Sequence, residues 1–221
     1  MTLEIRTVVS APFGENSYIV WQPDSRECVV FDPGLEPETL LQILAEERLE
    51  LVAILNTHGH ADHIAGNAAL KEAFPRAKLY IGHADAVMLT DAHANLSADF
   101  GFPLVSPAAD VFLHEGDTVQ AAGLNWQVLE IPGHTPGHVV YLCRDVTPWC
   151  LWGGDVLFRG SIGRFDFPGG NGRLLIQGIR QKLFSLPDNT VIYPGHGPVT
   201  TIGHEKRTNP YLRLGLIVEP Y

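Results

Sequence analysis

Hydrophobic and polar positions alternate through the first fifty residues in the manner of short strands. The segments "LEIRTVV", "NSYIVWQ" and "ECVVFD" are rich in Val, Ile and aromatic residues, and Pro, Gly and Asn turns separate them. The next segment, "EPETLLQILAEERLE", has leucines at helical spacing behind acidic residues that suit a helix start. The segment "LVAILNT" is typical of a fully buried strand. We therefore expect three strands, a helix and a buried strand in this order.

The alternation of helices and strands continues beyond this buried strand. "HIAGNAALKEAF" predicts a helix that stops before Pro75, followed by a strand around Leu79 and a helix from about Ala84 to Leu89. The segment from about Asn95 to Glu115 is interrupted by prolines, and we expect a loop-rich lid or edge there.

The second half of the chain repeats this mixture of strands and helices. "DTVQAAGLNWQVLEI" predicts a hairpin that turns at Ala122-Gly123, and "HVVYLC" and "WCLWGGD" add two strands. "GRLLIQGIRQKLFSL" predicts a helix, "TVIYPG" a last strand and "GHEKRTNPYL" a terminal helix. Strands and helices in each half favour an α/β sandwich of two packed sheets with helices outside, which we expect residues 1–221 to form as a single domain.

Composition and charge narrow the classes of partner. Hydrophobic residues make up 45% of the chain and the formal net charge is -10, so we expect a sizeable core and neither a nucleic-acid nor a membrane partner. The N-terminal segment lacks the basic start and apolar core of a secretion signal. Cys28, Cys143 and Cys150 form no CxxC motif, so we interpret them as core thiols and expect a reducing, cytoplasmic location.

The strongest chemical signal is the segment "NTHGHADHIAGN", which directly follows the predicted buried strand. It places His58, His60, Asp62 and His63 within six positions. Imidazole and carboxylate groups are the usual protein ligands of Zn²⁺, Fe²⁺ and Mn²⁺. Without a shared cation, groups crowded in this way would repel or desolvate one another. The segment therefore predicts metal binding.

Further ligands follow three later strands. His134 in "EIPGHTPGH", Asp155 in "LWGGDVLF" and His196 in "VIYPGHGP" each come after an apolar strand and a glycine. This recurrence indicates one shared rim where strand ends converge. We expect Asp155 to bridge two cations, with one site completed by His58, His60 and His134 and the other by Asp62, His63 and His196. Four other histidines are expected to be structural: His83, His93, His114 and His204. His138 is expected either to be structural or to support the metal site.

These motifs resemble the metallo-β-lactamase superfamily, whose signature is HxHxDH followed by a distant His, Asp and His. The segments that carry the resemblance are "THGHADHIAG", "PGHTPGH", "GGDVLF" and "YPGHGP". The resemblance implies a four-layer αβ/βα sandwich with a dinuclear site along one edge of its two sheets. Within the superfamily the chain looks most like the glyoxalase II group, the hydroxyacylglutathione hydrolases, through "FDPG", "GDVLFRGSIGRFDFPGG" and "PGHGPVTTIGHEKRTNPYL". The short segment after His196 is similar to the single-domain branch of that group, which lacks an appended helical domain.

The glyoxalase II resemblance implies hydrolysis of a small-molecule thioester, S-D-lactoylglutathione or a related hydroxyacyl thioester. Two divalent ions, zinc in first place and iron or manganese as alternatives, would hold a bridging hydroxide, because coordination lowers the pKa of water from ~15.7 to about 7. Asp62 and Asp155 are the expected catalytic residues. Asp32 either holds a metal-bound histidine in its tautomer or is a turn residue. The sequence leaves a homo-oligomer open.

The substrate contacts are expected in "GRFDF", after the bridging aspartate. In the two-domain relatives this loop supplies a basic residue and a tyrosine to glutathione, and Arg164 and Asp166 occupy the corresponding positions here. Arg164 suits a substrate carboxylate, with Asp166 orienting it. A simple ion pair within the loop is the alternative interpretation.

Other activities use almost the same residues. The persulfide dioxygenases resemble the chain in "HADHIAG" and in an Arg-x-Asp after the bridging aspartate; there a single Fe²⁺ would be held by His58, His134 and Asp155. A metal-dependent phosphodiesterase or lactonase is a further alternative. The segment "PGHGPVTTIGHEKRTNP" favours the hydrolase, and the intact ligand set argues against a non-catalytic binding module.

Overall fold

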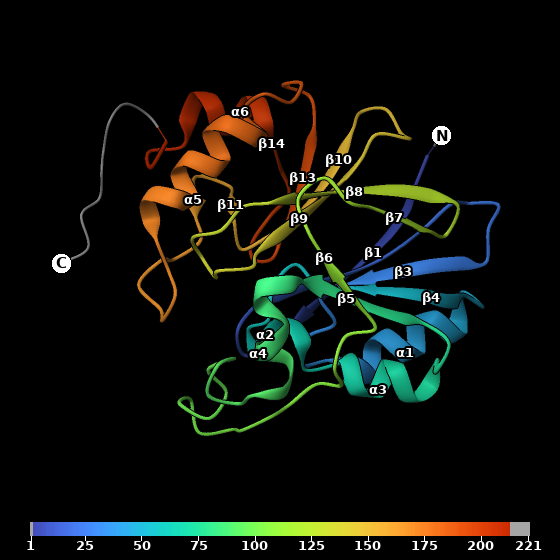
Figure 1. Cartoon of the computed structure of the whole chain (residues 1–221). Coiled ribbons are helices and arrows are strands. Elements are labelled where there is room, and N and C mark those ends of the chain that lie inside the picture. Colours follow the sequence, from blue (N-terminus) through green and yellow to red (C-terminus); the bar gives the residue numbers. More distant parts are fainter. Residues whose placement is uncertain (1, 213–221) are drawn as a thin grey trace.

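Two six-stranded sheets face each other in the computed structural model, which describes residues 2–212 (Figure 1). The first sheet has the strand order β1-β2-β3-β4-β5-β6. Its strands are β1 (Glu4–Ser10), β2 (Glu15–Trp21), β3 (Glu27–Phe31), β4 (Glu50–Leu55), β5 (Lys78–Gly82) and β6 (Val111–Leu113). Strands β1 to β3 pair antiparallel, and β3 to β6 pair parallel, so β3, β4 and β5 end at the same edge of the sheet.

The second sheet has the order β14-β13-β10-β9-β8-β7. Its strands are β7 (Thr118–Ala121), β8 (Leu124–Glu130), β9 (Val139–Cys143), β10 (Cys150–Gly154), β13 (Val191–Pro194) and β14 (Thr200–Thr201). Strands β10 and β13 are parallel neighbours. A small ribbon of β11 (Leu157–Phe158) and β12 (Ser161–Ile162) follows β10.

The central core lies between the two sheets and is rich in aromatic rings. Phe31 of the first sheet stacks on Trp152 of the second, with ring centroids 4.7 Å apart and planes 9° from parallel. The ring of Trp126 meets Phe31 edge-on at 5.2 Å. All three side chains are buried, and such rings dominate the apolar area that a core removes from water. This core fixes how the sheets sit relative to each other, and therefore which strand ends meet.

Helices cover the outer face of each sheet and complete four layers (Figure 1). On the first sheet lie α1 (Pro37–Glu46), α2 (Ala61–Ile64), α3 (Asn67–Ala73), the short 3-10 turn η1 (His83–Asp85) and α4 (Ala86–Thr90). On the second lie α5 (Gly172–Gly178), its π-helical continuation η2 (Ile179–Leu183) and α6 (Ile202–Thr208). The buried faces are the predicted ones, such as Leu40 and Leu44 of α1 and Leu175 of α5. The α/β sandwich predicted from the sequence is confirmed.

Several local predictions differ from the structure. The helix expected in "HIAGNAALKEAF" is wrong as one element, because α2 ends at Ile64 and α3 begins at Asn67. The break at Gly66 has a physical cause: its N–H donates to the carbonyl of Pro33, and a Cβ there would lie 2.9 Å from the carbonyl oxygen of Gly34. The expected loop up to Glu115 contains the short edge strand β6.

The predicted hairpin is confirmed. Strands β7 and β8 pair antiparallel on either side of Ala122 and Gly123, whose φ angles of 53° and 70° are those of a tight two-residue hairpin turn. The predicted terminal helix is shorter than expected. The side chain of Thr201 caps α6 by accepting from the N–H of His204, and the helix ends at Thr208.

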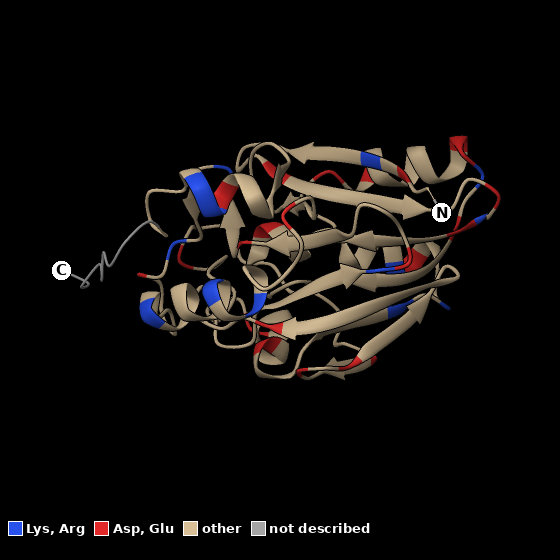
Figure 2. Cartoon of the chain, turned by 90° about the horizontal axis from the view of Figure 1, so that it is seen from above, with Lys and Arg blue, Asp and Glu red and all other residues tan. Residues whose placement is uncertain are grey.

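Net charge was the ground on which neither a nucleic-acid nor a membrane partner is expected. Basic and acidic residues are interspersed along the described chain (Figure 2). Among residues 2–212, no helix has the length and apolar character needed to cross a membrane. Cys28, Cys143 and Cys150 are free thiols buried in the core, as the sequence predicts.

Candidate metal centre

The seven sequence-predicted ligands come from four separate strand ends and meet at one edge of the sandwich. The loop after β4 and the start of α2 carry the first four, and the segments after β8, β10 and β13 carry one each. These residues are His58, His60, Asp62, His63, His134, Asp155 and His196. Two groups with ligand atoms close enough to share an ion are His58, His60 and His134, and Asp62, His63 and His196. In the second sheet β10 and β13 are parallel, and β8 runs in the same direction because each of β8 and β10 pairs antiparallel with β9, so these three strands end at the same edge.

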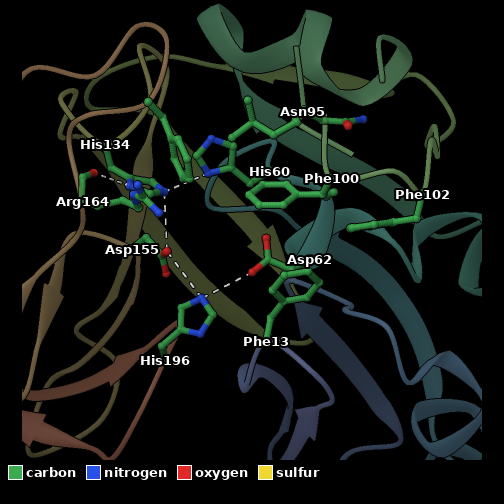
Figure 3. Close-up of a pocket in the computed structure, with 13 residues that line it drawn as sticks. Phe13, His60, Asp62, Asn95, Phe100, Phe102, His134, Asp155, Arg164 and His196 are labelled. Carbon is green, nitrogen blue, oxygen red and sulfur yellow. Dashed lines mark hydrogen bonds and ion pairs between the residues drawn. The ribbon is translucent and has the colours of Figure 1, made fainter. Parts of the chain in front are cut away.

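The first triad is built from three imidazole nitrogens. Nδ1 of His60 lies 3.1 Å from Nε2 of His58. The same atom lies 2.9 Å from Nε2 of His134 (Figure 3). Burial lowers the pKa of all three rings, and neighbouring histidines lower the pKa of His58 and His60 further. Neutral rings present lone pairs, so this triad offers three nitrogen ligands to a cation.

The second triad is richer in carboxylate. Oδ2 of Asp62 lies 3.5 Å from Nε2 of His196 and 3.8 Å from Nε2 of His63. Burial disfavours a charged imidazole at His63, but the carboxylates of Asp62 and Asp155 outweigh it and raise the pKa of His63 well above its usual value. The surroundings therefore favour positive charge at this triad, which a divalent cation can supply in place of protons.

Asp155 lies between the two triads. Its Oδ2 atom is 3.5 Å from Nε2 of His134 and 3.5 Å from Nε2 of His196 (Figure 3). Its Oδ1 atom is 3.5 Å from Nε2 of His63. Oδ1 of Asp155 and Nε2 of His63 are buried without a hydrogen-bond partner. Buried polar atoms without partners are costly. Their position, and the nitrogen and oxygen donors around them, fit a pair of divalent cations that share Asp155.

Hydrogen bonds hold the ring nitrogens that point away from the centre. Nδ1 of His63 lies 3.1 Å from Oδ2 of Asp32, and Nδ1 of His58 lies 3.1 Å from Oγ1 of Thr57. Thr57 in turn donates to Asp32 from its hydroxyl over 2.6 Å and from its N–H over 2.7 Å. Nδ1 of His134 donates to the carbonyl of Arg164 over 2.7 Å. Such partners fix the tautomer and the ring plane of a metal-binding histidine.

Sequence reasoning named Asp32 as a supporting residue but missed Thr57. Asp32 has a positive φ of 44° and is buried, so it occupies a turn and supports the site at the same time. The sequence signal for Thr57 was its place directly before His58.

His138 contacts two of the predicted ligand residues, Asp155 and His58. Its Nε2 atom accepts the N–H of Asp155 over 3.0 Å, and its ring stacks on His58 with centroids 4.8 Å apart. Burial keeps its pKa well below the usual value, so a neutral ring can accept this hydrogen bond. Gly154 leaves room for the ring, because a Cβ there would lie 2.8 Å from Nε2 of His138.

Asp85 joins the two loops that carry the first triad, and sequence reasoning missed it. Its carboxylate accepts from the hydroxyl of Thr135 over 2.6 Å, from the N–H of Gly137 over 2.6 Å and from the N–H of Gly59. Gly59 lies between His58 and His60, and Thr135 follows His134. Burial raises the pKa of Asp85 to about 6. The residue follows "IGHA" with no motif around it, so its role depends on tertiary placement.

The sequence also predicts a pair of substrate-binding residues, Arg164 and Asp166, and four structural histidines. Arg164 and Asp166 form a two-bond ion pair, with Nε to Oδ1 and Nη2 to Oδ2 both at 2.8 Å, and both side chains are exposed. Four histidines lie outside the centre and contact other side chains: His83 with His114, His93 with Asp99, and His204 with the buried Glu205.

A cavity of about 320 Å³ opens onto the two triads. Its lining combines ligand residues with aromatic and aliphatic side chains: Phe13, His60, Ala61, Asp62, Asn95, Leu96, Phe100, Phe102, His134, Asp155, Arg164, Phe167 and His196. A concave, largely apolar space with a few convergent polar groups is typical of a small-molecule site.

Comparisons with known proteins extend this description. Residues 11–196 match the sequence model of the metallo-beta-lactamase superfamily. The chain is 38% identical over 218 residues to hydroxyacylglutathione hydrolase GloC of Haemophilus influenzae, covering 96% of this chain and 98% of that protein. Among solved structures, BLEG-1 B3 metallo-beta-lactamase superposes with a TM-score of 0.90 at 36% identity, covering 95% of this chain and 100% of that one. TTHA1623 in a di-iron-bound form superposes with a TM-score of 0.83 at 38% identity, covering 94% and 100%.

Proposed function

This chain belongs to the metallo-β-lactamase superfamily, and on that basis we propose that it is a two-metal hydrolase of thioesters. The substrate class is S-D-lactoylglutathione or a related hydroxyacyl thioester, in line with the name of the Haemophilus influenzae relative. The observation that carries the proposal is the position of Asp155, whose carboxylate lies 3.5 Å from a histidine of each triad.

The donor set indicates which residues would hold the metals. His58, His60 and His134 would bind one ion and Asp62, His63 and His196 the other, with Asp155 shared. Zinc suits this mixture of imidazole and carboxylate, and iron or manganese accept the same donors. When bound, the ions would supply Lewis acidity, which acidifies a water and polarises the thioester carbonyl.

In this proposal Asp62 would orient the attacking water. It lines the cavity, and its Oδ2 atom faces His196. Burial alone would raise the pKa of Asp62, but His63 and His196 outweigh burial and hold the pKa below its usual value. The carboxylate is therefore ionised at neutral pH and can accept a hydrogen bond from water.

The lining of the cavity suits a thiolate leaving group. Among the described residues that line it there is no Lys or Tyr to protonate a poor leaving group. A thiolate departs without a strong general acid, whereas an amine does not. This difference supports a thioester rather than an amide as the substrate.

A direct assay separates this function from its alternatives. Metal-loaded protein is expected to release thiol from S-D-lactoylglutathione, measured with a chromogenic disulfide. The same preparation is tested on nitrocefin, because of the likeness to BLEG-1, and on bis-p-nitrophenyl phosphate. Faster turnover of either compound than of the thioester would overturn the proposal. Oxygen uptake on glutathione persulfide with one iron per chain would favour the dioxygenase instead.

A further inference from the structure

Four phenylalanines from three separate loops stand around the mouth of the cavity, and we call them the phenylalanine wall. Phe13 lies in the turn between β1 and β2, Phe100 and Phe102 in the loop between α4 and β6, and Phe167 in the loop after β12. The ring of Phe13 lies 6.3 Å from that of Phe100 and 5.8 Å from that of Phe102, and Phe100 lies 6.4 Å from Phe167. Figure 3 shows the rings of Phe13 and Phe100 beside Asp62 and His60.

The wall presents apolar rings to the cavity instead of burying them in the core. Phe100 is 56% exposed and Phe13 is 39% exposed. Leaving aromatic surface in water is unfavourable, and an exposed apolar patch beside a reactive centre is typical of a ligand-binding surface. The ring of Phe167 also contacts His60, a residue of the first triad, at a centroid distance of 5.5 Å. A ligand on the wall would therefore contact the centre as well.

The loop that carries Phe100 and Phe102 is held in place by buried polar groups. The side-chain amide of Asn95 donates to the carbonyls of Met88 and Leu104, and its side-chain oxygen accepts from Ser97. The main-chain carbonyl of Asn95 accepts the N–H of Ala61, in the ligand loop, over 3.1 Å. The loop with Phe100 and Phe102 is thus tied to the loop that carries metal ligands, so little conformational entropy of this loop is lost when a ligand binds.

The side chains that line the cavity offer little positive charge to an anionic ligand. Within the described part of the chain, Arg164 is the single Lys or Arg that lines it. Its guanidinium is already paired with Asp166 and lies 3.7 Å from the ring centroid of Phe167. A glutathione moiety carries two carboxylates, and among the described residues this paired Arg164 is the one lining Lys or Arg available to them. Apart from the metal ions of the proposed function, apolar contact is therefore the main source of affinity.

We propose that the site prefers thioesters that carry a bulky apolar substituent, above all an aromatic ring, which packs against the phenylalanine wall. The inference rests on the proposed function and narrows it. The substituent can belong to the acyl group or to the thiol, and both present the same chemistry to the wall.

The acyl side is tested with two glutathione thioesters that differ in one group. S-D-mandeloylglutathione carries a phenyl ring where S-D-lactoylglutathione carries a methyl. The expected kcat/KM for the mandeloyl ester is higher by about tenfold, since the extra apolar area leaves water. The difference is expected mainly in KM, because the wall contacts the substrate before and during the reaction.

The thiol side is tested in the same way with lactoyl thioesters of benzyl mercaptan and of ethanethiol. A preference of about tenfold for the benzyl compound would assign the wall to the thiol side. A preference in one arm alone identifies which part of the substrate faces the wall. Equal kcat/KM within both pairs would overturn the inference.

Variants connect the preference to the wall. Phe100→Ala is expected to reduce the preference for the aromatic substrate by about fivefold or more. Phe112→Ala is the matched control, because Phe112 is 49% exposed on β6 and does not line the cavity. A Phe100→Ala protein that keeps the full preference, or a Phe112→Ala protein that loses it equally, would contradict a role of the wall.

A binding measurement separates failure of this inference from failure of the proposed function. S-benzylglutathione and S-methylglutathione are thioethers and cannot be hydrolysed. Calorimetry on metal-loaded protein is expected to give about tenfold tighter binding of the benzyl compound, and a smaller ratio for Phe100→Ala. That result without turnover of any thioester would contradict the proposed function but would support binding of apolar groups by the phenylalanine wall. Turnover with equal binding of both thioethers, and no preference in the assays, would do the reverse.

Discussion

Nδ1 of His63 lies 3.1 Å from Oδ2 of Asp32, and both side chains are buried. This contact turns Nε2 of His63 toward the carboxylates of Asp62 and Asp155. Asp32 follows β3, and His63 lies in α2 after β4, so the pairing of two parallel strands sets the orientation of a metal-binding ring. The contact restricts the orientation of the ring, which lowers the entropic cost of binding an ion.

Removal of the Asp32 carboxylate is expected to weaken metal binding at the second triad. Asp32→Asn keeps the size of the side chain but loses the charge that favours the correct tautomer of His63. The expected loss in affinity for the ion at this triad is about 10–100-fold, measured by competition with a chromogenic chelator. Asp188→Asn, at a surface carboxylate paired with Lys206, serves as the control. Equal affinities for Asp32→Asn and the control would refute the orienting role.

Substitution of Asp85 is expected to affect the first triad selectively. Asp85 joins the Gly59 loop to the Thr135 loop, and these loops carry the three histidines of that triad. Asp85→Asn is therefore expected to lower affinity at one of the two sites by about tenfold or more, with little change at the other. The measurement is a two-site titration of metal-free protein with Zn²⁺.

A matched control for Asp85 is available elsewhere in the fold. Glu205 is also a buried carboxylate that accepts hydrogen bonds, from Thr200 and from the N–H of Gly160, outside the cavity. Glu205→Gln is expected to lower the melting temperature without a site-selective loss of metal. Equal losses of metal affinity at both sites in Asp85→Asn would mean general destabilisation. That result would argue against a specific role of Asp85 in joining the two loops of the first triad.

Asp85 also predicts a pH dependence of stability. Its pKa of about 6 in the folded protein exceeds the value of about 3.9 in an unfolded chain. Between these values the folded state binds the proton more tightly, so stability is gained as the pH falls through 6 and is lost as the pH rises through it. The partners of Asp85 are neutral, so burial dominates this shift. Relative to Asp85→Asn, the wild type should gain about 3 kcal/mol between pH 7.5 and pH 3.5.

Urea titrations of the metal-free proteins at a series of pH values measure this gain. Taking the difference between wild type and Asp85→Asn removes the contributions of the histidines and the other carboxylates that the two proteins share. A difference in the free energy of unfolding that stays constant across the series would show that Asp85 has an ordinary pKa.

A variant of Arg164 tests whether this residue contacts the substrate or only forms an ion pair within its loop. If Arg164 binds a carboxylate of the carrier thiol, Arg164→Gln should raise the KM for S-D-lactoylglutathione about three- to tenfold. The lactoyl thioester of ethanethiol has no carboxylate, so its KM should rise less in this variant. The comparison uses steady-state kinetics on both substrates. Equal changes in KM would leave Arg164 as the loop partner of Asp166.

Strand ends could be read from the sequence because each has a local pattern. An apolar run followed by glycine and then His or Asp predicted where β10 and β13 stop and which residue follows them. The HxHxDH segment likewise marked the end of β4. These patterns depend on hydrophobic periodicity and turn chemistry, which lie within a few residues of each other.

Other features depend on residues far apart in the chain. The break at Gly66 arises from contact with Pro33 and Gly34. The hydrogen bond that Asp85 accepts from Thr135 joins residues 50 positions apart. The phenylalanine wall likewise combines three loops whose relative positions are set by the packing of the two sheets. Local sequence patterns carry no signal for such contacts, so these features emerge only from the fold.

The most direct test of the central claim is a crystal structure of metal-loaded protein with anomalous data at the zinc, iron and manganese edges. Two peaks are expected on either side of Asp155, one contacted by His58, His60 and His134 and the other by Asp62, His63 and His196. The same crystals, dissolved, should hydrolyse the thioester. A single peak, or none, in fully active protein would contradict the two-metal account.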